Sequence, residues 1–460
     1  MTTNPQASTR YVSLLAAGAA LGGFLFGFDT STMNSAIVGI APALGLGTGA
    51  TGFVAAIALI GCAAGAWFAG PVSGRFGRTR VMLIAGVAIV IGSVAAALTS
   101  QVVLLGGVRF VTGLGIGAVS AVVPAYITEI SPTNIRGRLG TFWQFAIVIG
   151  QFAGLLAGYG LTTWAGSEMS PLPWGGAAWR WMFVTVAVLA ALYVLIARGL
   201  PPSPSDLVRR GHGDQARALL VRLADPRADE RIATIQKTQT AKGEVPTLKD
   251  LRGARFGLLP IVWTGILLAS FPQLVGISVV KTYSNSLWQT VGFSTNSAFA
   301  ISLFTVGVSI ASTVVAIIVM DKVGRRTLLF TGAAFMALAL GTMAFCFATA
   351  TGSTESLSLG REAGISALVA INVFAVAFGI TWGPIMWLML GELFSSDIRT
   401  TAVAVCVAVN WMMNWVVVRT FPWLAATSLG LTYALYAAFA LLALIFVWKA
   451  LPETRGRTLS

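Results

Sequence analysis

Long apolar segments, each about as long as a bilayer crossing, recur along the whole chain. The segments Val81 to Leu98 and Leu429 to Val447, for example, contain no charged residue. Because a helix needs about 20 apolar residues to cross the hydrocarbon core, each such segment predicts a membrane-spanning helix. We expect an all-α membrane protein with twelve spans, near residues 11–40, 51–73, 80–100, 102–127, 139–162, 179–200, 256–289, 295–320, 327–350, 363–391, 398–424 and 429–451.

The proportion of charged residues is too low for a water-soluble fold. Of the 460 residues, 10% are charged and 56% are hydrophobic, whereas a soluble domain carries about 25% charged residues. The formal net charge of +14 could indicate a nucleic-acid partner, but most basic residues lie in short connections between the apolar segments. We therefore expect the chain to contact the lipid bilayer and no nucleic acid.

The basic residues concentrate in alternate connections, and this predicts the orientation of the chain. The opposite connections contain only Arg361, with Arg180 close to one of them at the start of a span. By the positive-inside rule, the basic connections and both termini are expected in the cytoplasm, as an even number of spans requires. The basic connections hold Arg75, Arg78, Arg80, Arg136, Arg138, the loop 201–255, Lys322, Arg325, Arg326, Arg399, Arg455 and Arg457.

Residues that bind metals or carry out catalysis are scarce. Cys62, Cys346 and Cys406 all lie within apolar segments far apart in sequence, and the single histidine, His212, lies in a polar loop. Neither a metal-ligand spacing, nor a nucleophile with its base, nor a phosphate-binding loop is recognisable. We expect no metal, no cofactor and no enzymatic activity.

The polar stretch 201–255 divides the chain into two halves of six expected spans. We predict an N-terminal half over 1–200, a cytoplasmic linker with short helices over 201–255, and a C-terminal half over 256–460. Three landmarks occur in both halves in the same order, which indicates an internal duplication and suits alternating access to a central site. The paired landmarks are 74–78 with 321–326, Glu129 and 135–137 with Glu392 and 398–400, and 200–204 with 451–456.

Several motifs, taken together, resemble those of one transporter family. They are 22–29, 109–117, 126–129, 136–138 followed by Gln144 and Gln151, 273–277, 382–384 with Trp387, and 452–456. On these residues the chain resembles the sugar porter family of the major facilitator superfamily, which includes bacterial sugar–proton symporters and animal glucose carriers. The resemblance covers nearly the whole chain. It implies the major facilitator fold, with twelve transmembrane helices in two pseudo-symmetric six-helix halves, and secondary transport of a sugar.

Two ionisable residues within spans are the first functional candidates, because burying such a group costs about 3 kcal/mol on insertion scales. Counting about 1.5 Å per residue from the span ends puts Asp29 and Arg109 at a similar depth in the outer half of the membrane. The resemblance implies an acid at the Asp29 position in proton-using sugar porters. We therefore expect proton symport, with Asp29 as proton acceptor and Arg109 as its partner; a purely structural ion pair is the alternative.

Neutral polar and aromatic side chains within the spans are candidates for binding a hydroxylated ligand. Amides offer both donors and acceptors, Gln144 and Gln151 share one helix face, and the indole of Trp387 suits the C–H face of a pyranose. The family resemblance implies the rest of the set. The expected substrate-binding residues are Phe26, Gln144, Gln151, Gln273, Ser278, Ser309, Trp387 and Asn410. For any one of them, polar packing between helices is the alternative.

The second half of this expected pocket departs from the family pattern. Pro272 stands where the family has a second Gln, and Asn410 stands where it usually has Gln. Ser278 and Ser309 stand where it has Asn. Smaller side chains with fewer amides predict a substrate that is bulkier than a simple hexose or differently decorated.

Lys281 is a basic residue where the family is usually apolar, near the outer end of a span and close to Tyr283. We expect these two residues at an outer gate. Lys281 would extend toward the outer interface, pair with a gate carboxylate, or contact an anionic sugar. The alternative function is therefore an uncoupled facilitator, or a carrier of a polyol, a sugar acid or another anionic sugar.

Charged residues in the basic connections are expected to form a cytoplasmic gate. Its expected members are Arg75, Arg78, Glu129, Arg136, Asp321, Arg325, Glu392, Arg399, Glu453 and Arg455. The first half lacks two acids of the family pattern, at Gly74 and Pro202, and has Ser205 in place of an Arg. We expect this half to close less tightly on the cytoplasmic side, which would favour inward-open states.

Two functions outside this reading are less favoured. A membrane sugar sensor usually has long cytoplasmic tails, and the expected tails here are short; multidrug efflux does not need a pocket rich in amides. We expect a monomeric transporter in a prokaryotic plasma (inner) membrane, with a small-molecule sugar as substrate and the proton as coupling ion.

Overall fold

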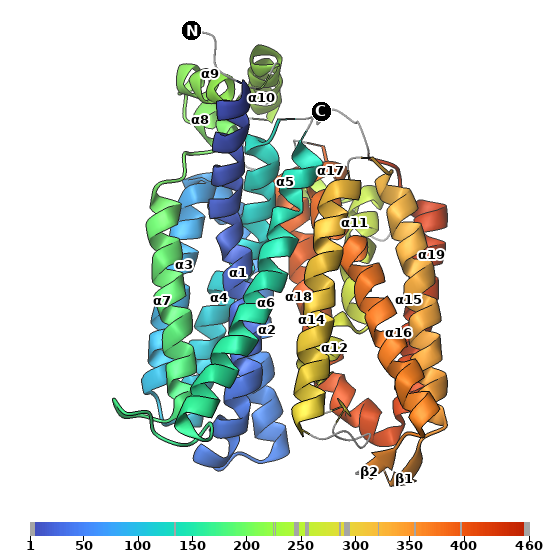
Figure 1. The fold of residues 1–460 in the computed structure, drawn as a ribbon. Helices are drawn as coiled ribbons and strands as arrows, with labels where there is room; N and C mark the ends of the chain where they lie inside the picture. Colours follow the sequence, from blue (N-terminus) through green and yellow to red (C-terminus); the bar gives the residue numbers. More distant parts are fainter. Residues whose placement is uncertain are drawn as a thin grey trace.

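The computed structural model describes residues 5–132, 135–223, 225, 227–242, 248–253, 257–284, 287–288, 295–320, 322–353, 356–395 and 398–454. In this part of the chain, 12 helical segments are long and apolar enough to cross a membrane. The N-terminal half, blue to green in Figure 1, lies beside the C-terminal half, yellow to red. The prediction of an all-α membrane protein with twelve spans in two six-helix halves is confirmed.

The N-terminal half consists of long helices and one short one. They are α1 (Pro5–Ala43), α2 (Thr48–Phe76), α3 (Arg78–Leu98), α4 (Val102–Ile130), α5 (Arg136–Gly140), α6 (Phe142–Ala165) and α7 (Ala178–Arg198). Close packing in this half depends on small residues. A Cβ on Gly117 of α4 would overlap the carbonyl oxygen of Cys62 in α2, and one on Gly27 of α1 would overlap that of Ile147 in α6. These glycines let neighbouring helix backbones approach closely, as is common in membranes.

The linker forms short helices at one end of the molecule. They are α8 (Pro204–Arg209), α9 (Gly213–Arg222), α10 (Ala228–Lys242) and the 3-10 helix η1 (Leu248–Leu251). A small apolar cluster holds α8, α9 and α10 together, and Leu207, Leu220 and Ile232 belong to it. Arg231 of α10 donates to the carbonyl oxygen of Glu129 at the end of α4 (2.5 Å), so this cluster is fastened to the N-terminal half.

The C-terminal half repeats the six-span pattern with two interruptions. Its elements are α11 (Pro260–Leu274), α12 (Ile277–Thr282), α14 (Thr295–Val319), α15 (Arg325–Ala348), the hairpin strands β1 (Thr351–Ser353) and β2 (Ser356–Ser358), α16 (Arg361–Ile380), α17 (Trp382–Leu393), α18 (Arg399–Thr427) and α19 (Leu429–Ala450). The segments expected as single spans near 256–289 and 363–391 are each divided into two helices. Gly276 has a left-handed backbone (φ +85°) between α11 and α12, and Thr381 separates α16 from α17.

The molecule has two ends with different structures. The linker end carries α8, α9 and α10, together with the start of α1 and the end of α19 (Figure 1). The hairpin end carries β1 and β2 on the opposite side. The described spans run between these two ends.

Candidate functional site

Asp29 of α1 and Arg109 of α4 form a bidentate ion pair inside the N-terminal half. Arg109 Nη1 lies 2.6 Å from Asp29 Oδ1, and Nη2 lies 3.0 Å from Oδ2. Both residues are nearly inaccessible, with exposed fractions of 3% and 2%, and the guanidinium lies over the ring of Phe183. A paired arrangement of this kind offsets the cost of burying each charge. The structure thus brings together the two residues that were expected to lie at one depth.

Buried amide side chains occur in both halves, and those of the C-terminal half are connected. Ser278 Oγ donates to Gln273 Oε1 (2.7 Å), and Gln273 Nε2 donates to Asn410 Oδ1 (3.1 Å). On α6, Gln144 and Gln151 are also buried. The Oε1 atom of Gln151 is buried without a hydrogen-bond partner in the described part of the chain, so it offers an acceptor to a ligand hydroxyl.

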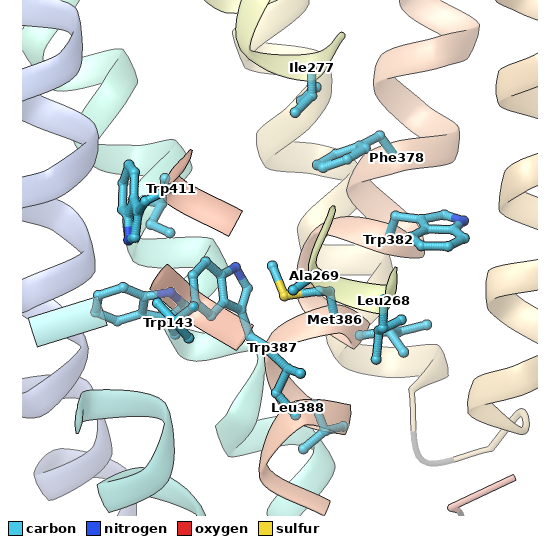
Figure 2. Packing of buried hydrophobic residues seen from close by; sticks show 14 of the residues in the cluster. Trp143, Leu268, Ala269, Ile277, Phe378, Trp382, Met386, Trp387, Leu388 and Trp411 are labelled. Carbon is cyan, nitrogen blue, oxygen red and sulfur yellow. The ribbon is translucent and has the colours of Figure 1, made fainter. Parts of the chain in front are cut away.

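Aromatic side chains join the two halves next to these amides. Phe26 of α1 lies edge-to-face with Trp411 of α18 at 4.8 Å, and Trp143 of α6 lies edge-to-face with Trp387 of α17 at 5.9 Å. Figure 2 shows Trp143, Trp387 and Trp411 close to one another. The indole of Trp411 also donates to Ser120 Oγ of α4 (2.9 Å). Aromatic pairs of this geometry contribute about 1 kcal/mol beyond burial, so this aromatic seam holds the halves together.

Three further expected residues, one from the pocket and two from the outer gate, make other contacts. Ser309 on α14 donates its hydroxyl to the carbonyl oxygen of Thr305 in its own helix (3.0 Å). Tyr283 donates to the carbonyl oxygen of Val418 (3.2 Å) and its ring packs against Phe421, so it is attached to α18. The main-chain oxygen of Lys281 accepts from Asn34 Nδ2 of α1 (3.3 Å), which links the halves near the hairpin end.

The charged residues at the linker end form two networks, one in each half. In the N-terminal half, Arg78 pairs with Glu129 and with Asp206. In the C-terminal half, Arg325 lies 3.7 Å from Glu392, and Glu453 accepts from the backbone N–H groups of 325 and 326. A cavity of about 30 Å³ lies between the halves here, and Arg78, Glu129 and Arg399 are among its lining residues.

The remaining residues expected in this gate differ in their surroundings. Arg75 is exposed at the end of α2, next to the ring of Phe76. Arg399 donates twice to the carbonyl oxygen of Phe394, and Arg136 at the start of α5 is buried. Asp321 and Arg455 lie outside the described residues.

Sequence reasoning missed several residues that take part in these contacts. Asn34, Ser120 and Trp411 each contribute to a contact between the halves. Asp206 is completely buried in the linker and supplies a carboxylate to Arg78. The sequence contained a signal for Asp206. Ser203 is followed directly by a proline and, three positions after the serine, by an acid, and this pattern is typical of a helix start.

The fold and this site define a membrane transporter of the major facilitator class. Two six-span halves enclose buried polar groups at their interface, and the broken helices α11–α12 and α16–α17 border it, as is common in transporters whose halves rock about a central site. A model of the family described as "Sugar (and other) transporter" matches residues 15–460, and the chain belongs to this family. It is therefore not an enzyme but an integral multi-pass membrane protein.

Individual relatives agree with this assignment. The chain is 40% identical over 455 residues to a "Glucose transport protein" of Synechocystis sp., covering 98% of this chain and 97% of the relative. It is 33% identical over 496 residues to a "D-xylose-proton symporter" of Escherichia coli K12, covering 99% and 96%. A solved proton:xylose symporter bound to 6-bromo-6-deoxy-D-glucose matches with a TM-score of 0.87 at 31% identity, over 98% of both chains.

A second conformation of the same transporter is also similar to this chain. The inward open conformation of the xylose transporter from E. coli matches with a TM-score of 0.73, at 29% identity and over 98% of both chains. This score is lower than that of the sugar-bound structure.

Proposed function

We propose that this protein is a proton-coupled sugar importer that works by alternating access. The observation that carries the proposal is the buried bidentate pair of Asp29 and Arg109. Asp29 lies one helical turn from Phe26, which contacts Trp411 of the opposite half. Protonation of the carboxylate would remove the charge that holds Arg109, and α1 would then be free to move relative to α4.

The chemistry of the central residues supports a hydroxylated substrate. Gln144, Gln151 and the linked amides of Gln273 and Asn410 supply donors and acceptors for hydroxyl groups. The indoles of Trp387 and Trp411 supply flat apolar faces for the C–H groups of a sugar ring. The printed names of the relatives, a glucose transport protein and a D-xylose-proton symporter, agree with a sugar of this kind.

The orientation follows from the distribution of charge. The linker end carries the basic connections, so we assign it to the cytoplasm and the hairpin end to the outside. The protein would act as a monomer in the inner membrane of a prokaryote. The central binding residues would then be open alternately to the cytoplasm and to the outside, as the two halves separate and rejoin along the aromatic seam.

Purified protein in proteoliposomes tests the proposal. Uptake of labelled glucose and xylose is measured with and without an inwardly directed pH gradient, over a panel of further sugars. We expect accumulation above the external concentration only when the gradient is present. Equal final levels with and without the gradient would show an uncoupled facilitator instead.

A second candidate, transport of an anionic sugar, is favoured by one observation. Lys281 is half-buried, and no carboxylate of the described residues forms an ion pair with it. A sugar acid could supply the missing negative charge. Competition of uronic and aldonic acids against the transported sugar decides the matter. If no acid competes at a hundredfold excess, this candidate is excluded.

A further inference from the structure

The turn between α2 and α3 brings the carbonyl end of one helix next to the N–H end of another. Helix α2 ends at Phe76, Gly77 turns the chain with φ +87°, and α3 begins at Arg78. The last carbonyl groups of α2 and the first N–H groups of α3 have no partners within their own helices. The helix dipoles favour a cation at the first of these positions and an anion at the second.

Helix α8 of the linker, together with Arg210 directly after it, supplies both charges. Asp206 Oδ2 accepts from the backbone N–H of Arg78 (2.8 Å), which caps the start of α3. Arg209 donates to the carbonyl oxygen of Ser73 (3.4 Å) and Arg210 to that of Phe76 (2.6 Å), which caps the end of α2. Two residues of α8 and Arg210, which directly follows it, therefore contact backbone groups on both sides of this turn.

The fit at this turn is close. Asp206 is fully buried, and its Oδ1 also accepts from Arg209 Nη2 at 2.7 Å. A Cβ added to Gly77 would lie 3.0 Å from Asp206 Oδ2 and 2.8 Å from Arg210 Nη2. No larger residue would leave the carboxylate and the guanidinium where they are.

In the C-terminal half, a different carboxylate caps the helix start at the equivalent turn. Glu453, which follows α19, accepts from the backbone N–H groups of Arg325 (3.0 Å) and Arg326 (3.1 Å) at the start of α15. Arg326 in turn donates to the carbonyl oxygens of Val447 and Trp448 near the end of α19. The capping carboxylate follows its arginine by 128 residues in both halves. The sequence motif, however, aligns Glu453 with Pro202 and not with Asp206.

We propose that Asp206 is the positioning residue of the N-terminal half of the gate, and that it replaces the carboxylate absent at Pro202. It fixes Arg78, which pairs with Glu129, and Glu129 lines the cavity that Arg399 of the opposite half also lines. Loss of this carboxylate would loosen the linker end while it is closed. The inference rests on the proposed alternating access. If Asp206 supplies this carboxylate, the absence of an acid at Pro202 no longer predicts weak closure of the N-terminal half.

The test measures how easily a reagent reaches that cavity from the linker end. Ala125 lines the cavity, and Cys62, Cys346 and Cys406 are buried, so all three are first replaced by alanine. Ala125→Cys is then labelled with a membrane-impermeant maleimide in vesicles that expose the linker end. We expect Asp206→Asn to raise the labelling rate at position 125 about tenfold, a typical size for the coupling of one such contact to a two-state change.

Two companion variants separate a gate effect from general loosening. Asp229→Asn removes a carboxylate of the same linker whose pair with Arg217 is exposed, and it should leave the labelling rate unchanged. Pro202→Glu combined with Asp206→Asn should restore the parent rate, because it returns a carboxylate to the position found in the other half. An increase that Pro202→Glu fails to reverse would mean local unfolding and would overturn the proposal.

A labelling rate in Asp206→Asn equal to that of the parent would also overturn it. If Asp206→Asn does not accumulate in the membrane, Asp206→Glu takes its place, because one more methylene misplaces the carboxylate at this close fit; the parent rate in that variant counts against the proposal equally. Labelling requires neither sugar nor a proton gradient. A labelling result that contradicts the role of Asp206 can therefore be told apart from an uptake result that contradicts proton-coupled transport.

Discussion

At the scale of single residues, the central site consists of groups whose hydrogen-bonding capacity is only partly used. Arg109 donates twice to Asp29, yet its Nε atom has no partner among the described residues. Gln151 likewise keeps a buried, unpaired Oε1. Such atoms are costly to leave alone, and a bound substrate or a change of partner would satisfy them.

Replacing Asp29 by asparagine separates coupling from transport. Asp29→Asn keeps the shape of the side chain but cannot bind and release a proton, so sugar exchange across the membrane should continue while accumulation against a gradient is lost. Counterflow and pH-driven uptake in proteoliposomes measure the two activities, and Asp214→Asn on the exposed surface of α9 serves as the control. Loss of both activities in Asp29→Asn would assign the pair a structural role only.

Gln151 and Ser309 should respond differently to truncation. Gln151→Ala removes an acceptor that is free to bind a hydroxyl group, and we expect KM to rise about tenfold, which corresponds to a loss of about 1.4 kcal/mol. Ser309 donates within its own helix, so Ser309→Ala should change KM by less than about twofold. Initial uptake rates over a range of sugar concentrations give both values, and a larger effect at 309 than at 151 would exclude this arrangement.

At the scale of elements, the break between α11 and α12 determines how two site residues are oriented. Gln273 lies before Gly276 and Ser278 lies after it, and the turn lets Ser278 Oγ reach back to Gln273. A continuous helix would not allow this bond, because residues five apart lie on different faces.

Gly276→Ala should therefore destabilise the C-terminal half. The positive φ is unfavourable for alanine, and the new Cβ would lie 2.8 Å from the ring of Tyr436. We expect a loss of about 1–3 kcal/mol and a melting temperature in detergent lower by several degrees. Gly341→Ala in α15, where an added Cβ meets nothing within 4 Å, is the matched control and should not lower the melting temperature.

Sequence patterns anticipated the spans better than the contacts. Hydropathy located twelve helices because bilayer thickness fixes their length, but it did not locate the breaks at Gly276 and Thr381, since an apolar run carries no information on backbone angles. The depth argument correctly placed Asp29 beside Arg109. By contrast, the partners of Tyr283 and Ser309 depend on helix rotation, which a motif does not specify. The expected outer-gate role of Lys281 and Tyr283 stays a prediction.

At the scale of the whole molecule, contacts between the halves occur at several depths. Trp411 with Ser120 and the ring pairs of the aromatic seam lie at the centre, and Asn34 with the main chain of Lys281 lies toward the hairpin end. In alternating access, one set must separate while the other persists.

A disulfide near the hairpin end should stop the cycle. In the background without natural cysteines, Asn34→Cys and Lys281→Cys are combined and oxidised, which would fasten α1 to α12 where the amide now meets the carbonyl oxygen. We expect sugar uptake to fall to background and to recover after reduction, while each single variant remains active. Transport at the parent rate by the cross-linked protein would show that these helices need not separate.

The attachment of α8, α9 and α10 also has a practical consequence. Arg231 holds α10 to the end of α4, Arg222 lies over the ring of Tyr11 in α1, and Asp206 holds α8 to the turn before α3. An antibody fragment raised against the exposed surface of these helices would therefore be fixed rigidly to the N-terminal six-helix half. Such a fiducial would give electron-microscopy images of this small protein the asymmetric feature they need for alignment, and it would report the tilt of that unit directly.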